Sequence, residues 1–440
     1  MQETQKTTIQ EFESEGNGRY GKYPNYKEID GSLLSVPDHW EVRRLKFCAK
    51  INPSKNEVED LDPETEVTFL PMEDVSEQGE INHGETELLE DVIDGYTYFR
   101  EGDVLVAKIT PCFENGKGAL AKNIKNNIGF GTTEFVVLRP DDELNNEFLY
   151  YVTASNLFRK VGEGQMKGAA GQKRVPDEFF QNFPQPLPPK EEQLAIVNFL
   201  NKEENRINKL IREKKRLIDL LREKEVSLIK NLVSNGIKSN RNVKQSGVEW
   251  LGDIPEDWEV RDLRYIADID TGDKDTKDAI DDGDYPFFVR SQTEERINSY
   301  TYDGEAVLTA GDGVGVGEVF HYVNGKFDYH QRVYKISDFP DEIDGKYLYY
   351  YLRANLKMEI FKNNAKSTVD SLRMPMFKSF PVAFGSLEEQ HDIVNLLDKQ
   401  SKETDDLVNK VREGIDRLKE YRTALITNTV TGQIDVRGEV

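Results

Sequence analysis

An internal repeat is the sequence feature that most constrains the fold of this chain. The segment VPDHWEVRRLKFCAKI at 36–51 matches IPEDWEVRDLRYIADI at 254–269 at about half of its positions. A second pair of segments begins with Glu-Glu-Gln at 191–193 and at 388–390. We call the segment between the two shared ends of each copy its body, and the two bodies barely resemble each other in sequence. We interpret this pattern as one scaffold used twice for two different tasks, and the alternative is an old duplication that has drifted without functional asymmetry.

The segments after the two Glu-Glu-Gln motifs predict long helices. Their apolar residues recur at steps of three and four, and neither segment contains proline. A helix of about 40 residues is a rod of roughly 60 Å, and its apolar stripe has to be buried. We expect an antiparallel two-helix coiled coil; the alternative is two ordinary helices, each packed on its own domain. The residues expected at this helix contact or at a subunit interface are Phe199, Leu200, Ile207, Leu210, Leu217, Leu221, Leu228, Leu396, Leu397, Leu407, Val411, Ile415, Leu418 and Leu425.

The sequences of the two bodies predict mixed α/β domains. Alternating and apolar runs indicate strands, and the Tyr-rich segments indicate helices whose tyrosines face the core. The expected strands are 103–109, 132–138, 306–310 and 327–336, and the expected helices are 147–158 and 346–356. The expected fold class is α/β (α+β), with two globular domains joined by two long antiparallel coiled-coil helices in a pseudo-twofold repeat. The expected boundaries are an arm without a repeat counterpart at 1–34, domains at 35–189 and 237–385, helices at 190–236 and 386–432, and a tail at 433–440.

The composition excludes several classes of protein. The chain has 440 residues, two cysteines and five histidines, without a CxxC or HExxH motif. A disulfide framework and a metal centre are therefore not expected. No apolar run is long enough to span a membrane, and the N-terminus has no apolar signal-peptide core, so we expect a cytoplasmic protein. No phosphate-binding loop or methyltransferase motif occurs, so no cofactor is expected.

The net charge of −23 is concentrated in two stretches. Residues 53–103 contain 17 acidic and 2 basic residues, and residues 268–284 contain 8 aspartates and 2 lysines. The rest of the chain is close to neutral. Since local charge decides where a phosphate group can bind, the overall acidity does not exclude a nucleic acid. The aspartate-rich run lacks the register of a calcium-binding loop, and we expect it to be solvated.

Two basic stretches occupy equivalent places, between the Tyr-rich helix and the Glu-Glu-Gln segment. The first contains Lys167 and the run Gly-Ala-Ala-Gly-Gln-Lys-Arg that ends at Arg174, and the second contains Lys366 and Arg373. Small residues allow the backbone to approach a ligand, and Arg, Lys and Gln are suited to base edges and phosphates. A solvated basic surface is the alternative, but the recurrence at one position of a repeat favours a DNA contact.

These features together resemble the specificity (S) subunit of type I restriction–modification systems. The motifs that carry the resemblance are Trp-Leu-Gly-Asp-Ile-Pro-Glu-Asp-Trp-Glu-Val at 250–260, Leu-Pro-Pro-Lys-Glu-Glu-Gln at 187–193, Gly-Gln-Lys-Arg-Val at 171–175 and Thr-Gly-Gln-Ile-Asp-Val-Arg-Gly at 431–438. Each motif is modest alone, and their order, repeated along almost the whole chain, is specific.

The resemblance implies a non-catalytic subunit with two target-recognition domains, each reading half of a split, asymmetric site in double-stranded DNA. Its implied partners are two methyltransferase (M) subunits that modify adenine and two motor–nuclease (R) subunits, without a membrane or a cofactor. Loop positions of suitable side-chain type are the candidates for DNA contact. They are Lys108, Lys117, Lys167, Gln172, Lys173 and Arg174 in the first domain, and Arg290, Gln292, Gln331, Arg332, Lys366 and Arg373 in the second.

Two other functions stay open. One is an acidic coiled-coil interaction scaffold, or a DNA mimic, that does not read DNA. The other is a self-sufficient nuclease or methyltransferase, which the missing cofactor motifs oppose. Steep salt dependence of DNA binding would separate a DNA reader from a mimic, because phosphate contacts release counterions.

Overall fold

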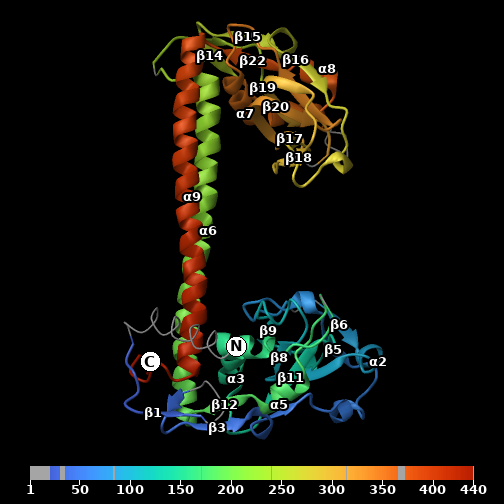
Figure 1. Cartoon of the computed structure of the whole chain (residues 1–440), viewed down its shortest axis with the longest axis vertical. Coiled ribbons are helices and arrows are strands. Elements are labelled where there is room, and N and C mark those ends of the chain that lie inside the picture. The colour runs from blue at the N-terminus through green and yellow to red at the C-terminus, as the bar shows by residue number, and fades with distance from the viewer. Residues whose placement is uncertain are drawn as a thin grey trace. The chain divides into compact units, whose positions relative to one another are not determined.

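A computed structural model of the chain describes residues 20–29, 35–82, 85–169, 171–238, 240–313, 315–364 and 372–439, without the side chains of 361–364. The chain forms two compact units (Figure 1). Unit 1 consists of Met1–Glu213 and Glu413–Val440, and unit 2 of Lys214–Arg412. Mixed α/β units of a repeated kind were expected, and this expectation is confirmed. No helix of the described part of the chain is long and apolar enough to cross a membrane.

Unit 1 contains two four-stranded sheets, with strand orders β4-β11-β8-β9 and β6-β5-β10-β7. Within the second sheet, β5 and β10 run parallel. The strands of these sheets are β4 (Ala49–Ile51), β5 (Glu66–Leu70), β6 (Thr86–Leu88), β7 (Thr97–Arg100), β8 (Val104–Ala107), β9 (Gly118–Leu120), β10 (Ile128–Gly131) and β11 (Phe135–Pro140). The short helices are η1 (Leu45–Phe47), η2 (Lys55–Val58), η3 (Met72–Asp74), α2 (Leu89–Val92), η4 (Lys125–Asn127), α3 (Asn146–Ala154), α4 (Asn156–Glu163) and α5 (Asp177–Asn182).

Unit 2 contains one six-stranded sheet of order β16-β21-β19-β20-β17-β18. Its strands are β16 (Asp268–Thr271), β17 (Tyr285–Phe288), β18 (Glu295–Ile297), β19 (Tyr302–Ala310), β20 (Phe320–Tyr329) and β21 (Val333–Ser337). Its short helices are η5 (Leu263–Tyr265), η6 (Thr276–Asp278), α7 (Gly345–Asn364) and α8 (Met374–Lys378).

The two bodies share a strand order that their sequences do not reveal. The antiparallel set β4-β11-β8 of unit 1 corresponds to β16-β21-β19 of unit 2. The parallel pair β5 and β10 corresponds to the parallel pair β17 and β20. One topology therefore supports two different sets of side chains.

Two elements expected as continuous are each divided in two. The strand expected at 327–336 is two strands, β20 and β21, separated by a turn at His330–Arg332. The helix expected at 147–158 breaks at Ser155, whose extended backbone ends α3 and whose hydroxyl accepts from the backbone N of Phe158 to begin α4. In both places apolar residues stand on either side of a short polar break, and apolar periodicity does not detect so short an interruption.

The matching ends of the repeat build one junction twice. In unit 1 the buried Trp40 donates from Nε1 to Oε1 of Glu192 at 3.0 Å. In unit 2 the buried Trp258 donates from Nε1 to Oε2 of Glu389, also at 3.0 Å. The tryptophan precedes a short strand, β3 (Glu41–Arg44) or β15 (Glu259–Asp262), which pairs with β12 (Pro184–Leu187) or β22 (Pro381–Phe384). The shared Trp and Glu thus attach each body to a long helix.

The glutamine of the Glu-Glu-Gln motif connects the same long helix to the Tyr-rich helix. Oε1 of Gln193 accepts from the backbone N of Asn145 at 2.7 Å, and Oε1 of Gln390 accepts from that of Asp344 at 2.9 Å. Asn145 and Asp344 stand directly before α3 and α7. Tyr347, Tyr350 and Tyr351 of α7 are core residues as expected, since each is at most 4% exposed.

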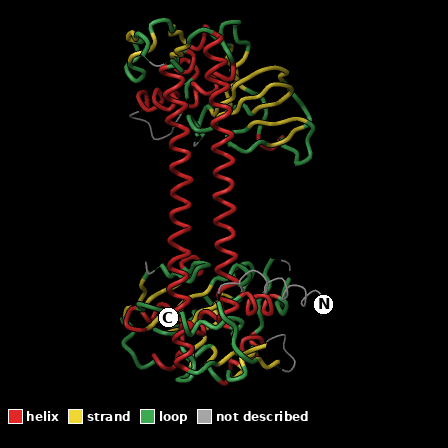
Figure 2. The backbone as a smooth tube through the Cα atoms, turned by 90° about the vertical axis from the view of Figure 1, so that its left-hand side faces the viewer, coloured by secondary structure: helices red, strands yellow, loops and turns green. Residues whose placement is uncertain are grey.

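The long helices are α6 (Lys190–Asn235) and α9 (Leu387–Val430), and each contributes to both units. Within each unit their segments run side by side (Figure 1, Figure 2). Unit 1 contains the first part of α6 and the last part of α9. Unit 2 contains the last part of α6 and the first part of α9, as expected for an antiparallel pair. The ends are formed by Gly236 and Gly432, with φ of 74° and 72°.

Buried or partly buried positions recur along both helices as a heptad, with alternating steps of three and four residues. We call these positions the seam. On α6 they are Glu204, Ile207, Ile211, Lys214, Ile218, Leu221, Glu225, Leu228 and Leu232. On α9 they are Val394, Leu397, Ser401, Thr404, Val408, Val411, Ile415, Leu418, Arg422, Leu425 and Thr429.

Three exposed leucines expected in the helix contact lie outside the seam. Leu210, Leu217 and Leu407 are 37%, 45% and 48% exposed, and the seam uses the next residue along the chain in each case. The error arises because adjacent apolar residues allow two registers of the stripe. Phe199, Leu200 and Leu397 are buried in the core of their own unit, and Leu396 packs against it. A contact of the exposed leucines with another subunit stays a prediction.

Residues 26–28 of the N-terminal arm have a counterpart in the repeat, contrary to expectation. β1 (Tyr26–Glu28) pairs antiparallel with β2 (Ser35–Pro37), and β13 (Val243–Gln245) pairs in the same way with β14 (Asp253–Pro255). The chain ends of unit 1 also meet, because the backbone N of Asp435 donates to the carbonyl of Gly21 at 2.8 Å. Backbone pairing needs no identical side chains, so sequence matching missed this correspondence.

Candidate nucleic-acid interface

Three loops of unit 1 meet at one end of the sheet formed by β8 and β11. We call this set, residues 108–110, 132–134, 167–169 and 171–174, the loop edge of unit 1. The backbone N of Lys108 donates to the carbonyl of Glu134 at 2.8 Å, and the backbone N of Val175 donates to that of Lys108 at 2.8 Å. These bonds bring together Lys108, Lys173 and Arg174, which the sequence predicted separately.

The Gly-rich loop before Val175 is a tight hairpin. Lys167 and Arg174 exchange two backbone hydrogen bonds of 2.9 Å. Gly168 has φ of 136°, and a Cβ atom there would lie 2.6 Å from the carbonyl oxygen of Gln172. Glycine is therefore required at the start of this loop. The loop presents Lys167, Gln172 and Lys173 as exposed side chains.

Arg174 forms a forked ion pair with Glu134. Its Nε lies 2.9 Å from Oε2 and its Nη2 lies 2.7 Å from Oε1 of Glu134. The side chains are 45% and 22% exposed. The hydrogen bonds from Arg174 lower the pKa of Glu134, so the pair is ionised at neutral pH. The sequence did not single out Glu134, because acidic residues are too abundant in this chain to be informative.

The other two candidates of unit 1 have different surroundings. Lys108 lines an open hollow of about 260 Å³ together with Lys55, Tyr96 and Thr133. Lys117 points elsewhere, since its Nζ donates to the backbone carbonyl of Met72 at 3.0 Å. Lys117 is therefore engaged within the unit and does not join the loop edge.

The equivalent loop edge of unit 2 consists of residues 289–292, 311–313 and 330–332. The backbone N of Gly311 donates to the carbonyl of Arg332 at 2.8 Å, and the backbone N of Leu372 donates to that of Gly311 at 2.9 Å. Gly311, Arg332 and Leu372 thus take the places of Lys108, Glu134 and Val175. A tight turn was expected in the Gly-rich run at 311–317, and Gly313 and Gly317 have the positive φ that such turns use.

Asp312 holds two arginines at this loop edge. Nη1 of Arg290 lies 2.8 Å from Oδ1 of Asp312, and Nη1 of Arg332 lies 3.3 Å from Oδ2. The arginine side chains are 39% and 54% exposed. The equivalent place is therefore acidic in unit 1, where Glu134 stands, and basic in unit 2, where Arg332 stands.

Polar side chains surround this arginine pair. Nε2 of Gln331 donates to Oδ2 of Asp275 at 3.0 Å, so the aspartate-rich stretch reaches the loop edge of unit 2. Gln292 donates to the carbonyl of Phe320 at 3.2 Å. Burial, followed by the charge of Arg290, lowers the pKa of His330, which is 4% exposed. This histidine was not predicted from the sequence.

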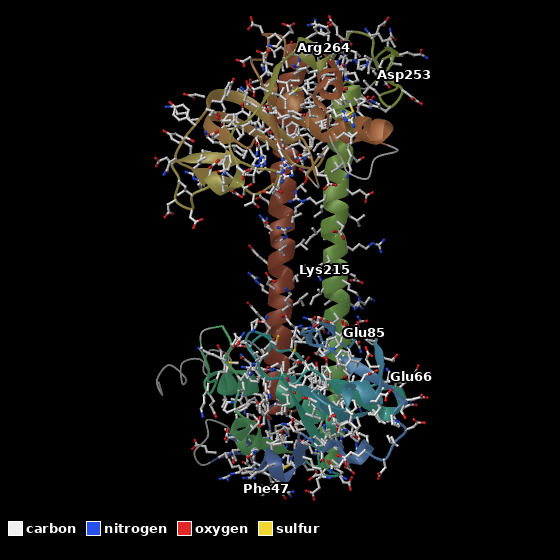
Figure 3. All side chains as sticks on the ribbon, turned by 90° about the vertical axis from the view of Figure 1, so that its right-hand side faces the viewer. Phe47, Glu66, Glu85, Lys215, Asp253 and Arg264 are labelled. Carbon is white, nitrogen blue, oxygen red and sulfur yellow. The ribbon has the colours of Figure 1, made fainter. Side chains whose placement is uncertain are left out.

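The remaining candidates of unit 2 lie after the loop edge. Arg373 is exposed and directly precedes α8. Lys366 lies outside the described residues. In unit 1 the acidic stretch is largely peripheral: Figure 3 shows Glu66 and Glu85 at the surface. Among the described residues, no group of three or more His, Cys, Asp or Glu side chains is arranged to hold a metal ion.

Comparison with known proteins identifies relatives of both halves. The family described as "Type I restriction modification DNA specificity domain" matches residues 37–219 and 255–417. The EcoAI specificity subunit of Escherichia coli is 46% identical over 166 residues, which are 37% of this chain and 28% of that protein. The match thus spans less than a third of that relative. The MjaVIII specificity subunit of Methanocaldococcus jannaschii is 24% identical over 95% of this chain and 98% of its own length.

Solved structures share the fold. A chain from work on complex assembly and conformational transition of the type I R-M system has a TM-score of 0.67 at 19% identity, covering 90% of this chain and 98% of that one. The HsdS subunit from Thermoanaerobacter tengcongensis has a TM-score of 0.52 at 19% identity, covering 94% of this chain and 100% of its own. With both halves matched by the family and the repeat described above, this chain belongs to the type I restriction–modification DNA specificity family.

Proposed function

We propose that the chain reads a bipartite, asymmetric DNA site, with one half-site for each unit. The observation that carries the proposal is the contrast between the junctions and the loop edges. The junction residues Trp40 and Glu192 have identical counterparts in unit 2, whereas Glu134 is replaced by Arg332. Two readers of different sequences need one scaffold and different contact residues.

The candidate contacts have separate roles in this proposal. Lys108, Lys167 and Lys173 would neutralise phosphates, which fixes register without reading sequence. Gln172 and Gln331 carry the amide that pairs with adenine N6 and N7. Lys117 and Gln292 donate to backbone carbonyls, and they would support their loops.

The duplicated scaffold also supports a role in assembly. Two equivalent units offer equivalent surfaces to two copies of one partner. We therefore propose that two methyltransferase subunits bind this chain and modify adenine, and that two motor–nuclease subunits join them. In this proposal the chain itself carries out no catalysis.

Methylome sequencing tests this function. Cells that express the chain with its methyltransferase partner should methylate adenine in a split motif that is absent with the partner alone. Replacing residues 35–189 by the corresponding domain of another specificity subunit should then change one half of the motif. A complex that forms without producing any motif would contradict the proposal.

An acidic scaffold or DNA mimic is the second candidate function. The observation that favours it is the position of Asp275 and Asp312 at the loop edge of unit 2, beside the arginines that would bind DNA. A mimic would show no DNA binding at any salt concentration. A reader that contacts phosphates would bind less tightly as salt rises, with a linear decrease of log K against log salt.

A further inference from the structure

The arginine–carboxylate pairs of the two units fall into two classes. Arg43 contacts Glu41 and Glu143, and Arg261 makes the same contacts with Glu259 and Glu342. These pairs repeat residue for residue, as scaffold contacts should. The pairs at the loop edges do not repeat: unit 1 uses Arg174 with Glu134, and unit 2 uses two arginines with one aspartate.

The geometry of Arg174 leaves a donor edge available. A guanidinium has five N–H groups, and Arg174 directs Nε and Nη2 to Glu134. Within the described residues, no hydrogen-bond partner stands at its Nη1. Nη1 and the second N–H of Nη2 therefore form a two-pronged edge, which matches O6 and N7 of guanine in the major groove.

The arginines of unit 2 have a comparable arrangement. Arg290 and Arg332 each contact Asp312 through Nη1, and among the described residues no hydrogen-bond partner stands at Nε or Nη2 of either side chain, so these groups can bind a ligand. Since one carboxylate faces two guanidinium groups, the cluster of Asp312, Arg290 and Arg332 has a net positive charge. A shared carboxylate also holds both guanidinium groups in fixed places, which reduces the entropy lost on binding.

We propose that Arg174 reads a guanine in one half-site and that Arg290 and Arg332 read guanine in the other, with Glu134 and Asp312 as positioning residues. This inference rests on the proposed function and names the base that each loop edge recognises. Glu134 and Asp312 act through the arginines, because their oxygens occupy the guanidinium N–H groups that do not face DNA.

Methylome sequencing of single variants tests the assignment in the assembled complex. Arg174→Ala should reduce the preference for guanine over other bases at one position of one half-site, by about tenfold to a hundredfold. Arg332→Ala, and more fully Arg290→Ala with Arg332→Ala, should relax a position in the other half-site. Arg43→Ala and Arg261→Ala are matched controls that remove a carboxylate-paired arginine from each unit, and they should leave the motif unchanged.

Conservative variants separate reading from structure. Arg174→Lys keeps the charge but loses the planar fork, so it should relax the same position as Arg174→Ala. Glu134→Gln should relax that position partially, and it should have no further effect in the Arg174→Ala chain. A Glu134 variant that weakened methylation equally at all sites would contradict the positioning role.

Each outcome decides between the two levels of the proposal. A wild-type complex without a split motif would overturn the proposed function and the guanine assignment with it. A split motif that Arg174→Ala leaves unaltered would overturn the guanine assignment alone. If Arg174→Ala abolishes methylation, binding of the purified complex to duplexes decides: loss of preference for guanine at one position supports the assignment, and retained preference contradicts it.

Discussion

Glu192 is the residue on which the junction of unit 1 depends. Its carboxylate is buried and accepts hydrogen bonds from Trp40 and Tyr23, with His39 as a further partner at 2.8 Å. Glu192→Ala would leave the buried indole N–H and hydroxyl without an acceptor. We expect a loss of about 3 kcal/mol in the free energy of unfolding, measured by urea unfolding of the full chain. Exposed Glu191 is the matched control, and an equal loss for Glu191→Ala would contradict this role.

His330 should make the stability of unit 2 depend on pH. Its Nδ1 accepts from the backbone N of Arg332 at 3.0 Å, which requires the neutral ring. Because the folded pKa lies below the unfolded value of about 6.5, the unfolded chain binds more protons at mildly acidic pH. The contribution of neutral His330 to the stability of unit 2 is complete above about pH 6.5, and it decreases as the pH drops below this value.

The measurement is thermal unfolding between pH 7.5 and pH 5.5. The variant His330→Asn keeps an acceptor without a titrating ring, so its stability should decrease less over this range. Burial also lowers the pKa of His321, so part of the decrease should remain in the variant. An identical decrease in both chains would show that His330 does not contribute.

At the residue scale, the sequence indicated candidate residues by side-chain type but did not indicate which side chains contact each other. The sequence indicated Arg174 because it lies in a basic stretch that recurs in the repeat, and Arg332 because it is a loop residue of suitable side-chain type. It missed Glu134 and Asp312, since one carboxylate among 81 acidic residues carries no signal. Only the backbone bonds between distant loops reveal which carboxylate meets which arginine.

The long helices show how far periodicity predicts an element. Their existence follows from the apolar spacing, and their ends follow from Gly236 and Gly432. The register of the seam does not follow, because Leu210 and Ile211 are adjacent and equally apolar. Packing decides between them, and polar seam residues such as Glu225, which accepts from Ser401 at 2.7 Å, obscure the pattern further.

Val408 and Leu407 provide a direct test of the seam. Val408 is fully buried and Leu407 is 48% exposed. Val408→Ala removes two buried carbon groups, so it should reduce the free energy of unfolding by about 2 kcal/mol. Leu407→Ala should change it by less than about 0.5 kcal/mol. The measurement is urea unfolding of the full-length variants, and a reversed order would place the seam in the register that the sequence first suggested.

The molecule as a whole consists of two versions of one unit. The sequence predicted that a repeat exists, but it did not predict how much of each unit repeats. Identical residues marked the junctions, where Trp40 and Trp258 need the same partners. The bodies share a topology without shared residues, since a sheet requires apolar alternation and not particular side chains. The correspondence of β1 with β13 was likewise invisible, because it rests on backbone pairing.

Unit 1 is assembled from both ends of the chain, and this arrangement predicts the effect of truncation. Deleting residues 1–28 removes β1, the bond from Tyr23 to Glu192, the contact of Gly21 with Asp435 and the ring of Tyr20 against Phe199 at 5.1 Å. A loss of about 3 kcal/mol in a unit of this size would lower the melting temperature by roughly 6–12 °C.

Differential scanning calorimetry of the truncated chain measures this shift. Deleting residues 1–19 is the matched control, because it leaves Tyr20, Gly21, Tyr23 and β1 in place. Since β13 makes the equivalent pairing in unit 2 within a continuous chain, the transition of unit 2 should keep its temperature in both truncations. An unchanged melting temperature after removal of 1–28 would mean that β1 and Tyr23 do not stabilise unit 1, and that its core closes without the N-terminal segment.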